Sequence, residues 1–279
     1  MNAHWADIGV RTLLDSSLVL AQVLILNRLG IPFAAITLFA GLAAYGVATA
    51  LHFGPLLFIL AVALSVLLVV VFTALVRALP QDSYLLLTLA VLGVGGALVS
   101  ASAALGGQLG MSSTSSVLRA QEPGPFLWCA VPLFLLAFGS LWLLDRSQLG
   151  LAVEVARMAR QEKHAISFIP LWPITALVFF IASGLAFSSG AFQALYTGRV
   201  DPNVFRIENA IPMLVATLAA GRSPWRASAI ALTFFIFPDL FSVLVGYQRS
   251  AMAQVREIIW SVAIVLLAEK QFAGARIVR

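Results

Sequence analysis

The side chains that could perform chemistry are few and widely spaced in this sequence. It has 12 acidic residues, 3 histidines and 1 cysteine among 279 positions. His4, His52 and His164 lack the spacing that metal ligands need, and no paired acid and base, nucleophile elbow or phosphate-binding glycine loop occurs. Cys129 stands alone, which excludes an intrachain disulfide and a cysteine-based zinc site. The sequence therefore predicts no enzyme, no metal and no cofactor, and any ATP-driven step needs a partner protein.

Polar residues inside apolar stretches are the second group that could act on a solute. Asp239 follows Pro238 deep in an apolar run, where a charge costs about 2.5–3.5 kcal/mol on insertion scales. It either meets a helix partner or lines a pathway, and we expect it to face the protein interior. Tyr45 and Thr88 offer hydroxyls that bond either to helix backbone or to a solute. Glu208 is either a carboxylate stabilised at a helix N-terminus or a fourth pathway-lining residue.

One charged, amphipathic stretch, residues 145–164, interrupts the apolar sequence. At about 100° per residue, one arc of this predicted helix is apolar and comprises Leu149, Leu151, Ala152, Val155, Ala156, Met158 and Ala159. The other arc comprises Glu154, Arg157, Arg160, Gln161 and His164, with Val153 as an exception. Glu154 and Arg157 are close enough in sequence to pair. The stretch either rests on anionic lipid or docks on a cytoplasmic partner.

The remaining sequence is apolar enough to lie in a membrane. Hydrophobic residues make up 61% of the chain and charged residues 10%, with a mean hydropathy of +0.99. Soluble domains have about 25% charged residues, so a soluble globule is excluded. A span needs about 20 apolar residues, and we expect one all-α transmembrane bundle over residues 1–279 with about 8–10 spans. Nine are placed at Val10–Asn27, Pro32–Leu51, Pro55–Val76, Tyr84–Leu105, Phe126–Leu144, Phe168–Thr197, Ile207–Ala220, Trp225–Gly246 and Ala251–Ala268.

The net charge of +5 does not indicate a nucleic-acid partner, because the 17 basic residues are spread over short loops. If residues 145–164 are cytoplasmic and the nine spans alternate, most of the basic residues lie inside, as the positive-inside rule requires. These are Arg28, Arg77, Arg146, Arg157, Arg160, Lys163, Arg222, Arg226, Lys270, Arg276 and Arg279. The N-terminus is then expected outside and the C-terminus inside.

Several motifs, in one order along the chain, resemble those of a transporter family. Residues 198–205, Gly-Arg-Val-Asp-Pro-Asn-Val-Phe, are similar to a signature Gly-x-x-Ser-Pro-x-x-Phe. Residues 238–240, Pro-Asp-Leu, look like Pro-Glu-Leu, and residues 183–186, Ser-Gly-Leu-Ala, look like Ala-Gly-Leu-Ala. Residues 147–152, Ser-Gln-Leu-Gly-Leu-Ala, look like the Ser-x-Phe-Gly-x-Ala of a cytoplasmic helix. Through them the chain resembles the permease subunits of branched-chain amino-acid ABC importers, most closely the LivM type.

This resemblance implies a multi-pass permease subunit in a bacterial inner (cytoplasmic) membrane. The implied cargo is a branched-chain amino acid or a related small polar solute such as urea or an amide, moved with ATP that partner subunits hydrolyse. The implied partners are a second, LivH-like permease, two cytoplasmic ATPase subunits, an extracytoplasmic substrate-binding protein and membrane lipid. The family's cytoplasmic helix aligns with residues 145–164, so the expected ATPase-coupling residues are Gly150, Glu154, Arg157, Arg160 and Gln161.

One departure from the family leaves other functions open. Ala219, Ala220 and Arg222 stand where the family has the glycines of a Gly-Gly-x-Gly turn, so this turn is expected to be built differently. A scaffold or assembly subunit that does not transport is one alternative. A stand-alone secondary transporter is another, although it should show coupling-ion carboxylates and an internal repeat, and no duplication is evident.

Overall fold

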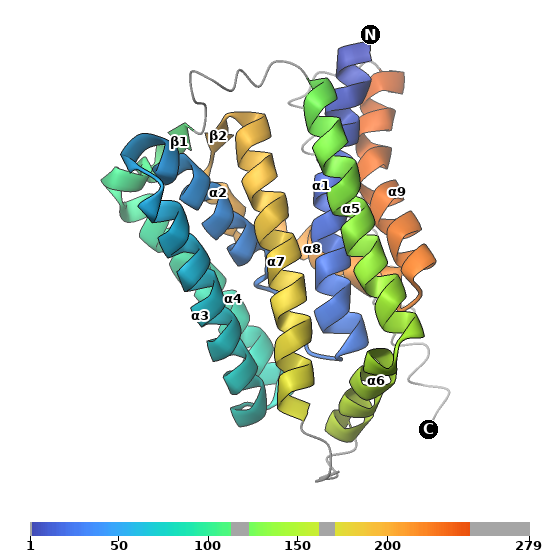
Figure 1. The fold of residues 1–279 in the computed structure, drawn as a ribbon. Helices are drawn as coiled ribbons and strands as arrows, with labels where there is room; N and C mark the ends of the chain where they lie inside the picture. The colour runs from blue at the N-terminus through green and yellow to red at the C-terminus, as the bar shows by residue number, and fades with distance from the viewer. Residues whose placement is uncertain (1, 113–122, 162–170, 246–279) are drawn as a thin grey trace.

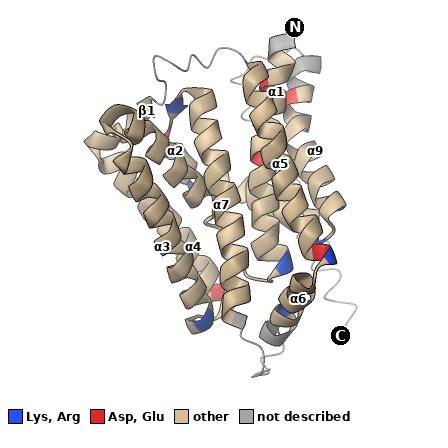
Figure 2. Cartoon of the chain, in the orientation of Figure 1, with Lys and Arg blue, Asp and Glu red and all other residues tan. Residues whose placement is uncertain are grey.

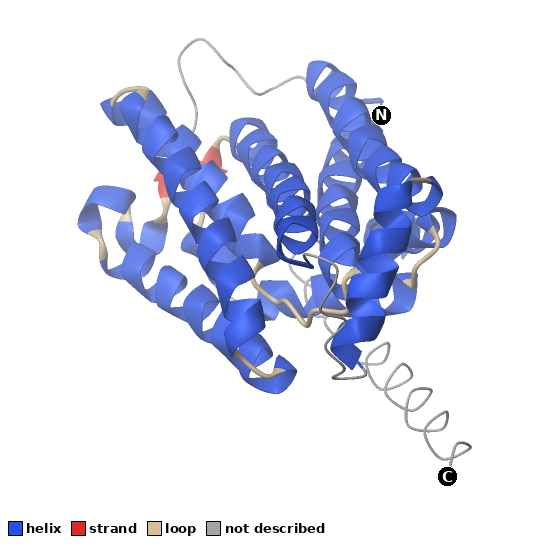
Figure 3. Ribbon diagram, turned by 60° about the horizontal axis from the view of Figure 1, so that its bottom comes forward, coloured by secondary structure: helices blue, strands red, loops and turns tan. Residues whose placement is uncertain are grey.

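The computed structural model describes residues 2–112, 123–161 and 171–245, which are almost entirely helical (Figures 1 and 3). The α-helices are α1 (Asn2–Val23), α2 (Ile36–Phe53), α3 (Leu56–Ala78), α4 (Gln81–Ala101), α5 (Pro123–Arg146), α6 (Gln148–Gln161), α7 (Leu171–Thr197), α8 (Ile207–Ala220) and α9 (Pro224–Val245). A π-helical segment, η1 (Leu24–Arg28), continues α1, and the 3-10 turns are η2 (Ala103–Leu105), η3 (Gly107–Leu109) and η4 (Pro202–Phe205). Strands β1 (Met111–Ser112) and β2 (Arg199–Val200) pair antiparallel, with Met111 opposite Val200.

Six of the described helices are long and apolar enough to cross a membrane: α1 with η1, then α2, α3, α4, α5 and α7. This confirms the predicted all-α, multi-pass bundle. Helix α8, with 14 residues, is shorter than a full span. Helix α9 has 22 residues and coincides with the predicted eighth span. The predicted ninth span, Ala251–Ala268, lies outside the described residues.

The helix boundaries follow from glycine and proline in the sequence. Helix α2 ends at Phe53, before Gly54, whose φ of 113° few other residues adopt, and Pro55 follows directly. Pro80 precedes the first residue of α4. Gly198 and Gly221, with φ of 68° and 69°, follow α7 and α8. These described helix boundaries therefore have a local cause.

Helices α1 and α2 form the centre of the bundle, and α3, α4 and α5 lie at its periphery. In the most apolar stretch of each, 78% of α1 and 67% of α2 is buried, against 22%, 17% and 28% for α3, α4 and α5. Helix α7 packs most extensively against α2, and α1 contacts α5, α7 and α9. Apolar side chains such as Leu56, Ile59 and Leu67 of α3 are exposed, as expected for a surface that meets lipid or another membrane protein.

Helices α2 and α7 approach each other closely at Gly190. A Cβ atom on Gly190 of α7 would lie 2.1 Å from the carbonyl oxygen of Ala40 in α2, so only glycine fits there. The neighbouring Ser189 Oγ donates a hydrogen bond of 2.9 Å to the Leu14 carbonyl of α1. Small residues bring helix backbones together in this way in membranes, and α7 is thereby held against both central helices.

The segment between η1 and α2, residues 29–35, is irregular yet buried in the protein, where the sequence predicted helix from Pro32 onward. Irregular backbone at membrane depth needs protein partners for its polar groups. Gln22 Nε2 donates to the Phe33 carbonyl at 3.0 Å, and the Ala34 N–H donates to Thr88 Oγ1 at 3.3 Å. Side chains of α1 and α4 therefore replace the hydrogen bonds that a helix would have supplied.

Charged residues lie mostly toward the two ends of the bundle (Figure 2). The chain runs from the N-terminal end along α1 to η1, returns along α2, and continues to alternate, so that α6 lies at the end opposite the start of α1 (Figure 1). Arg28, Arg77 and Arg146 occupy the last turns of η1, α3 and α5. The end of the bundle that carries α6 is therefore the basic end.

Candidate functional site

Helix α6 lies across the basic end of the bundle, and its contacts differ from the predicted division into arcs. Val153 and Ala156 are 2% and 0% exposed, because α6 packs on α5, α7 and η1 through them. Leu151 is 70% exposed and Met158 44% exposed. The apolar arc is therefore divided in its burial: Ala156 packs inward with Val153, whereas Leu151 and Met158 face away from the bundle.

Glu154 and Arg157 of α6 are turned toward the rest of the chain. Arg157 donates from Nη2 to Glu154 Oε1 at 2.6 Å and from Nε to Oε2 at 3.2 Å, so the expected pair is present and bidentate. Arg222, just after α8, donates from Nη1 to the same Glu154 Oε1 at 3.1 Å. The Arg157 side chain is only 13% exposed and lies over Gly30, where a Cβ would be 2.8 Å from Arg157 Cγ. Glu154 therefore ties α6 to the turn between α8 and α9.

Two further contacts join the end of α1 to its neighbours. Arg28 Nη1 lies 2.8 Å from Asp145 Oδ1, which connects η1 to the last turn of α5. Asn27 Nδ2 donates to the carbonyls of Thr217 and Gly221, at 2.6 and 2.7 Å, and so caps the C-terminus of α8. These carbonyls would otherwise lack partners at a helix end. The turn that lacks the family's glycines is thus held by an asparagine from η1.

The corner between α5 and α6 depends on Gly150. Its N–H donates to the Ser147 carbonyl at 3.0 Å and to Ser147 Oγ at 3.3 Å. A Cβ on Gly150 would lie 1.7 Å from the Leu144 carbonyl oxygen, so a larger residue would open the corner. Arg160 and Gln161 end the helix, and the structure does not describe their side chains.

The four candidate pathway residues come from four different helices, α2, α4, α8 and α9. Tyr45 is buried and stacks on Phe205, with ring centroids 5.8 Å apart, and its hydroxyl has no hydrogen-bond partner among the described residues. Thr88 Oγ1 donates to the Leu85 carbonyl and accepts from the buried segment 29–35, which is a structural role. Glu208 is exposed, and its Oε2 lies 3.8 Å from Arg206 Nη1. Asp239 is partly buried on α9, which packs mainly on α1 and α8.

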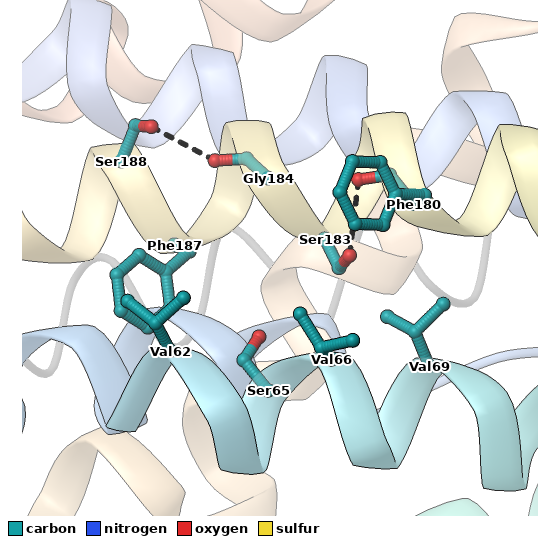
Figure 4. Close-up of a pocket in the computed structure, with 9 residues that line it drawn as sticks. All are labelled: Val62, Ser65, Val66, Val69, Phe180, Ser183, Gly184, Phe187 and Ser188. Carbon is teal, nitrogen blue, oxygen red and sulfur yellow. Dashed lines mark hydrogen bonds between the residues drawn. The ribbon is translucent and has the colours of Figure 1, made fainter. Parts of the chain in front are cut away.

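Sequence reasoning missed a groove between α3 and α7, about 200 Å³ in volume, near the middle of both helices (Figure 4). It is lined by Val62, Ser65, Val66, Val69, Phe180, Ser183, Gly184, Phe187 and Ser188. The small residues at 183, 184 and 188 were a signal of close packing, but nothing in the sequence indicated that α3 would lie opposite them.

The comparisons with known proteins agree with this architecture. A family model described as the permease component of the branched-chain amino acid transport system matches residues 16–268, which is most of the chain. Neither the curated proteins nor the solved structures contain a match. The matched region includes all the contacts of α6 described above and every described span except the first part of α1. The chain is therefore a multi-pass membrane protein that belongs to the family of branched-chain amino acid transport permease components.

Proposed function

We propose that residues 1–279 form one permease domain of an ABC importer, in which α6 docks on an ATPase. The observation that carries the proposal is the exposed apolar side of α6, which includes Leu149, Leu151 and Met158 and lies outside the bundle. An exposed apolar patch on a helix at the membrane boundary needs a partner. The cargo is a branched-chain amino acid or a related small polar solute, and the family match supports that class.

The distribution of basic residues supports a cytoplasmic position for α6 in a bacterial inner membrane. Arg28, Arg77, Arg146, Arg222 and Arg226 belong to segments at the α6 end. Away from the α6 end are Arg11 in α1, Arg199 in β2 and Arg206 between η4 and α8. The positive-inside rule places the more basic end in the cytoplasm, where ATPase subunits can reach α6. The binding protein then meets the opposite end, and a second permease completes the pathway.

The ion pairs at the basic end provide a route for coupling. Movement of α6 acts directly on the α8–α9 turn through Glu154 and Arg222, and on η1 through the packing of Arg157 over Gly30. Asp145 and Arg28 connect the end of α5 to η1 as well. A displacement of α6 is thus transmitted to η1 and through it to α1, one of the two central helices. Coupling of this kind requires such a continuous physical connection or a shared two-state element.

Leu151→Asp is expected to weaken docking of the ATPase without preventing membrane insertion. Burial of a charge in an apolar interface is costly, and losses of about 1–2 kcal/mol at interface positions correspond to about tenfold in affinity. The measurement is co-purification of the ATPase together with ATP-dependent uptake. Leu151→Met, which keeps an apolar surface, is the matched control. Normal co-purification and uptake by Leu151→Asp would remove α6 as the docking helix.

Charge reversal at Arg157 tests a different contact. The Arg157 guanidinium is turned inward and pairs with Glu154. Arg157→Glu therefore removes an ion pair inside the subunit and leaves the proposed docking surface unchanged. Leu151→Asp is therefore the cleaner test of docking.

The purified chain alone is expected neither to hydrolyse ATP nor to drive uptake with ATP, because its sequence has no phosphate-binding loop. The measurement is phosphate release and leucine uptake in liposomes, with the complete complex as the control. ATP-dependent uptake by the single chain would contradict the proposal. Uptake driven by an ion gradient alone would favour a secondary transporter instead.

A further inference from the structure

We propose that the groove between α3 and α7 is this subunit's contribution to the solute pathway, and that it accepts a small zwitterion with an aliphatic body. This inference rests on the proposed transport function and adds a site to it. The groove lies at the midpoint of both helices, since Ser65 is near the centre of α3 and Ser183 and Gly184 are near the centre of α7. A solute crossing the membrane must pass this depth.

On the α3 side of the groove, the Ser65 hydroxyl forms no hydrogen bond with another described residue. Ser65 is 7% exposed, and its Oγ makes no hydrogen bond within the part of the chain that the structure describes. Figure 4 shows this hydroxyl directed from α3 toward α7. A serine or threonine in a membrane helix ordinarily donates its hydroxyl to a carbonyl one turn earlier in the same helix, as Thr73 of α3 does to the Val69 carbonyl. Ser65 instead remains available to a molecule in the groove.

The opposite wall offers hydrogen-bond acceptors. Ser183 Oγ donates to the Phe180 carbonyl at 3.1 Å, and Ser188 Oγ donates to the Gly184 carbonyl at 2.9 Å. A hydroxyl has one proton and two lone pairs, so each of these oxygens can still accept. Acceptors on α7 suit an ammonium group, and the free Ser65 O–H suits a carboxylate. The polar groups thus match both ends of a zwitterion.

The rest of the lining is apolar and sets the class of solute. Val62, Val66 and Val69 of α3 face Phe180 and Phe187 of α7, and none of the described lining residues is charged. Small-molecule sites are commonly mostly apolar with a few polar groups. Drug-sized ligands need pockets of roughly 300–1,000 Å³, so a groove of about 200 Å³ fits a smaller molecule. Without a fixed charge to hold it, a solute can enter and leave, as a pathway requires.

A thiol placed at the groove can distinguish an aqueous pathway from a lipid-facing or helix-filled surface. The chain has one cysteine, so a Cys129→Ser background leaves a single introduced thiol. Gly184→Cys borders the groove, and Gly93→Cys is the matched control on α4. Both glycines are exposed in the middle of a helix, and a Cβ at either would meet nothing within 4 Å. Both variants are therefore compatible with the fold.

The assembled complex is treated with a charged, membrane-impermeant methanethiosulfonate and, separately, with an apolar maleimide. We expect the charged reagent to modify Gly184→Cys and not Gly93→Cys, and leucine to slow that reaction about tenfold when present at about ten times its dissociation constant. Reaction with the apolar maleimide alone would identify a lipid-facing groove and overturn the proposal. Protection of Gly184→Cys from both reagents would identify a partner helix in the groove and overturn it too, as would labelling that leucine does not slow.

Uptake by the complex separates failure of the groove from failure of the proposed function. Gly184→Leu places a side chain in the groove, and its clash with the solute is expected to lower leucine uptake about tenfold or more, whereas Gly93→Leu should leave uptake near wild type. If Gly184→Leu takes up leucine as well as wild type, the proposal that the groove lies on the pathway is wrong, but the proposed transport function stands. Absence of leucine uptake by the wild-type complex would instead contradict the proposed function.

Discussion

Gly190→Ala is expected to force α2 and α7 apart and to lower the stability of the folded permease by about 3 kcal/mol, near the upper end of the cost of over-packing. The added methyl group would lie 2.1 Å from the Ala40 carbonyl oxygen and 2.5 Å from the Ala40 Cα atom. These are backbone atoms of a central helix and cannot rotate away. Thermal unfolding in detergent, followed by loss of the monodisperse peak in size-exclusion chromatography, measures the effect.

The same substitution six positions earlier on the same helix is the control. A Cβ at Gly184 meets nothing within 4 Å, and alanine is favoured over glycine in a helix by about 0.5–1 kcal/mol. Gly184→Ala should therefore be as stable as wild type or slightly more stable. If Gly190→Ala unfolds at the wild-type temperature, the close contact between α2 and α7 is not present in the protein.

Gly150→Ala is expected to abolish coupling between α6 and the bundle while leaving the spans inserted. A Cβ at this position would lie 1.7 Å from the Leu144 carbonyl oxygen, so the corner between α5 and α6 must open. Because Arg222 reaches Glu154 at 3.1 Å only when α6 lies against the bundle, opening the corner breaks this contact too. Displacements of about 1 Å can cost about a hundredfold in positioned chemistry, and we expect a loss of similar size in ATP-dependent uptake.

Gly139→Ala in α5 is the matched variant, since its Cβ would meet no atom within 4 Å. ATP-dependent uptake and co-purification of the ATPase are measured for both proteins in the same vesicles. The proposed coupling role of the corner fails if Gly150→Ala transports as well as Gly139→Ala.

The spans could be predicted from sequence because their signal is local. A run of about 20 apolar residues has few alternatives to a membrane helix. The helix boundaries are local as well, because they lie at residues with strong conformational preferences: Gly54 with Pro55, Pro80 and Gly221. The pair of Glu154 and Arg157 was predictable for the same reason, since residues three apart share a helix face.

Tertiary contacts made the remaining features unpredictable. Val153 looked misplaced on its helix, yet it packs inward because the bundle lies on that side. Residues 32–35 were predicted as helix, but Gln22 and Thr88, from two other helices, stabilise an irregular backbone there. Ser65 gave no signal at all, because the groove that it faces exists only where α3 meets α7. Each depends on which helices become neighbours, and hydropathy alone does not encode that choice.

The burial of segment 29–35 and the contact of α2 with α7 also constrain how the chain is made. Helix α2 leaves the ribosome long before α7, which begins at Leu171. At roughly 5–20 residues per second, the delay is about 6 to 24 s. During that time α2 lacks its main partner, and Thr88 on α4 has yet to be synthesised when the segment first enters the bilayer. The contact of α2 with α7 and the hydrogen bond from Ala34 to Thr88 can therefore form only after these later helices are made, so the centre of the bundle is completed late although its first two helices are made early.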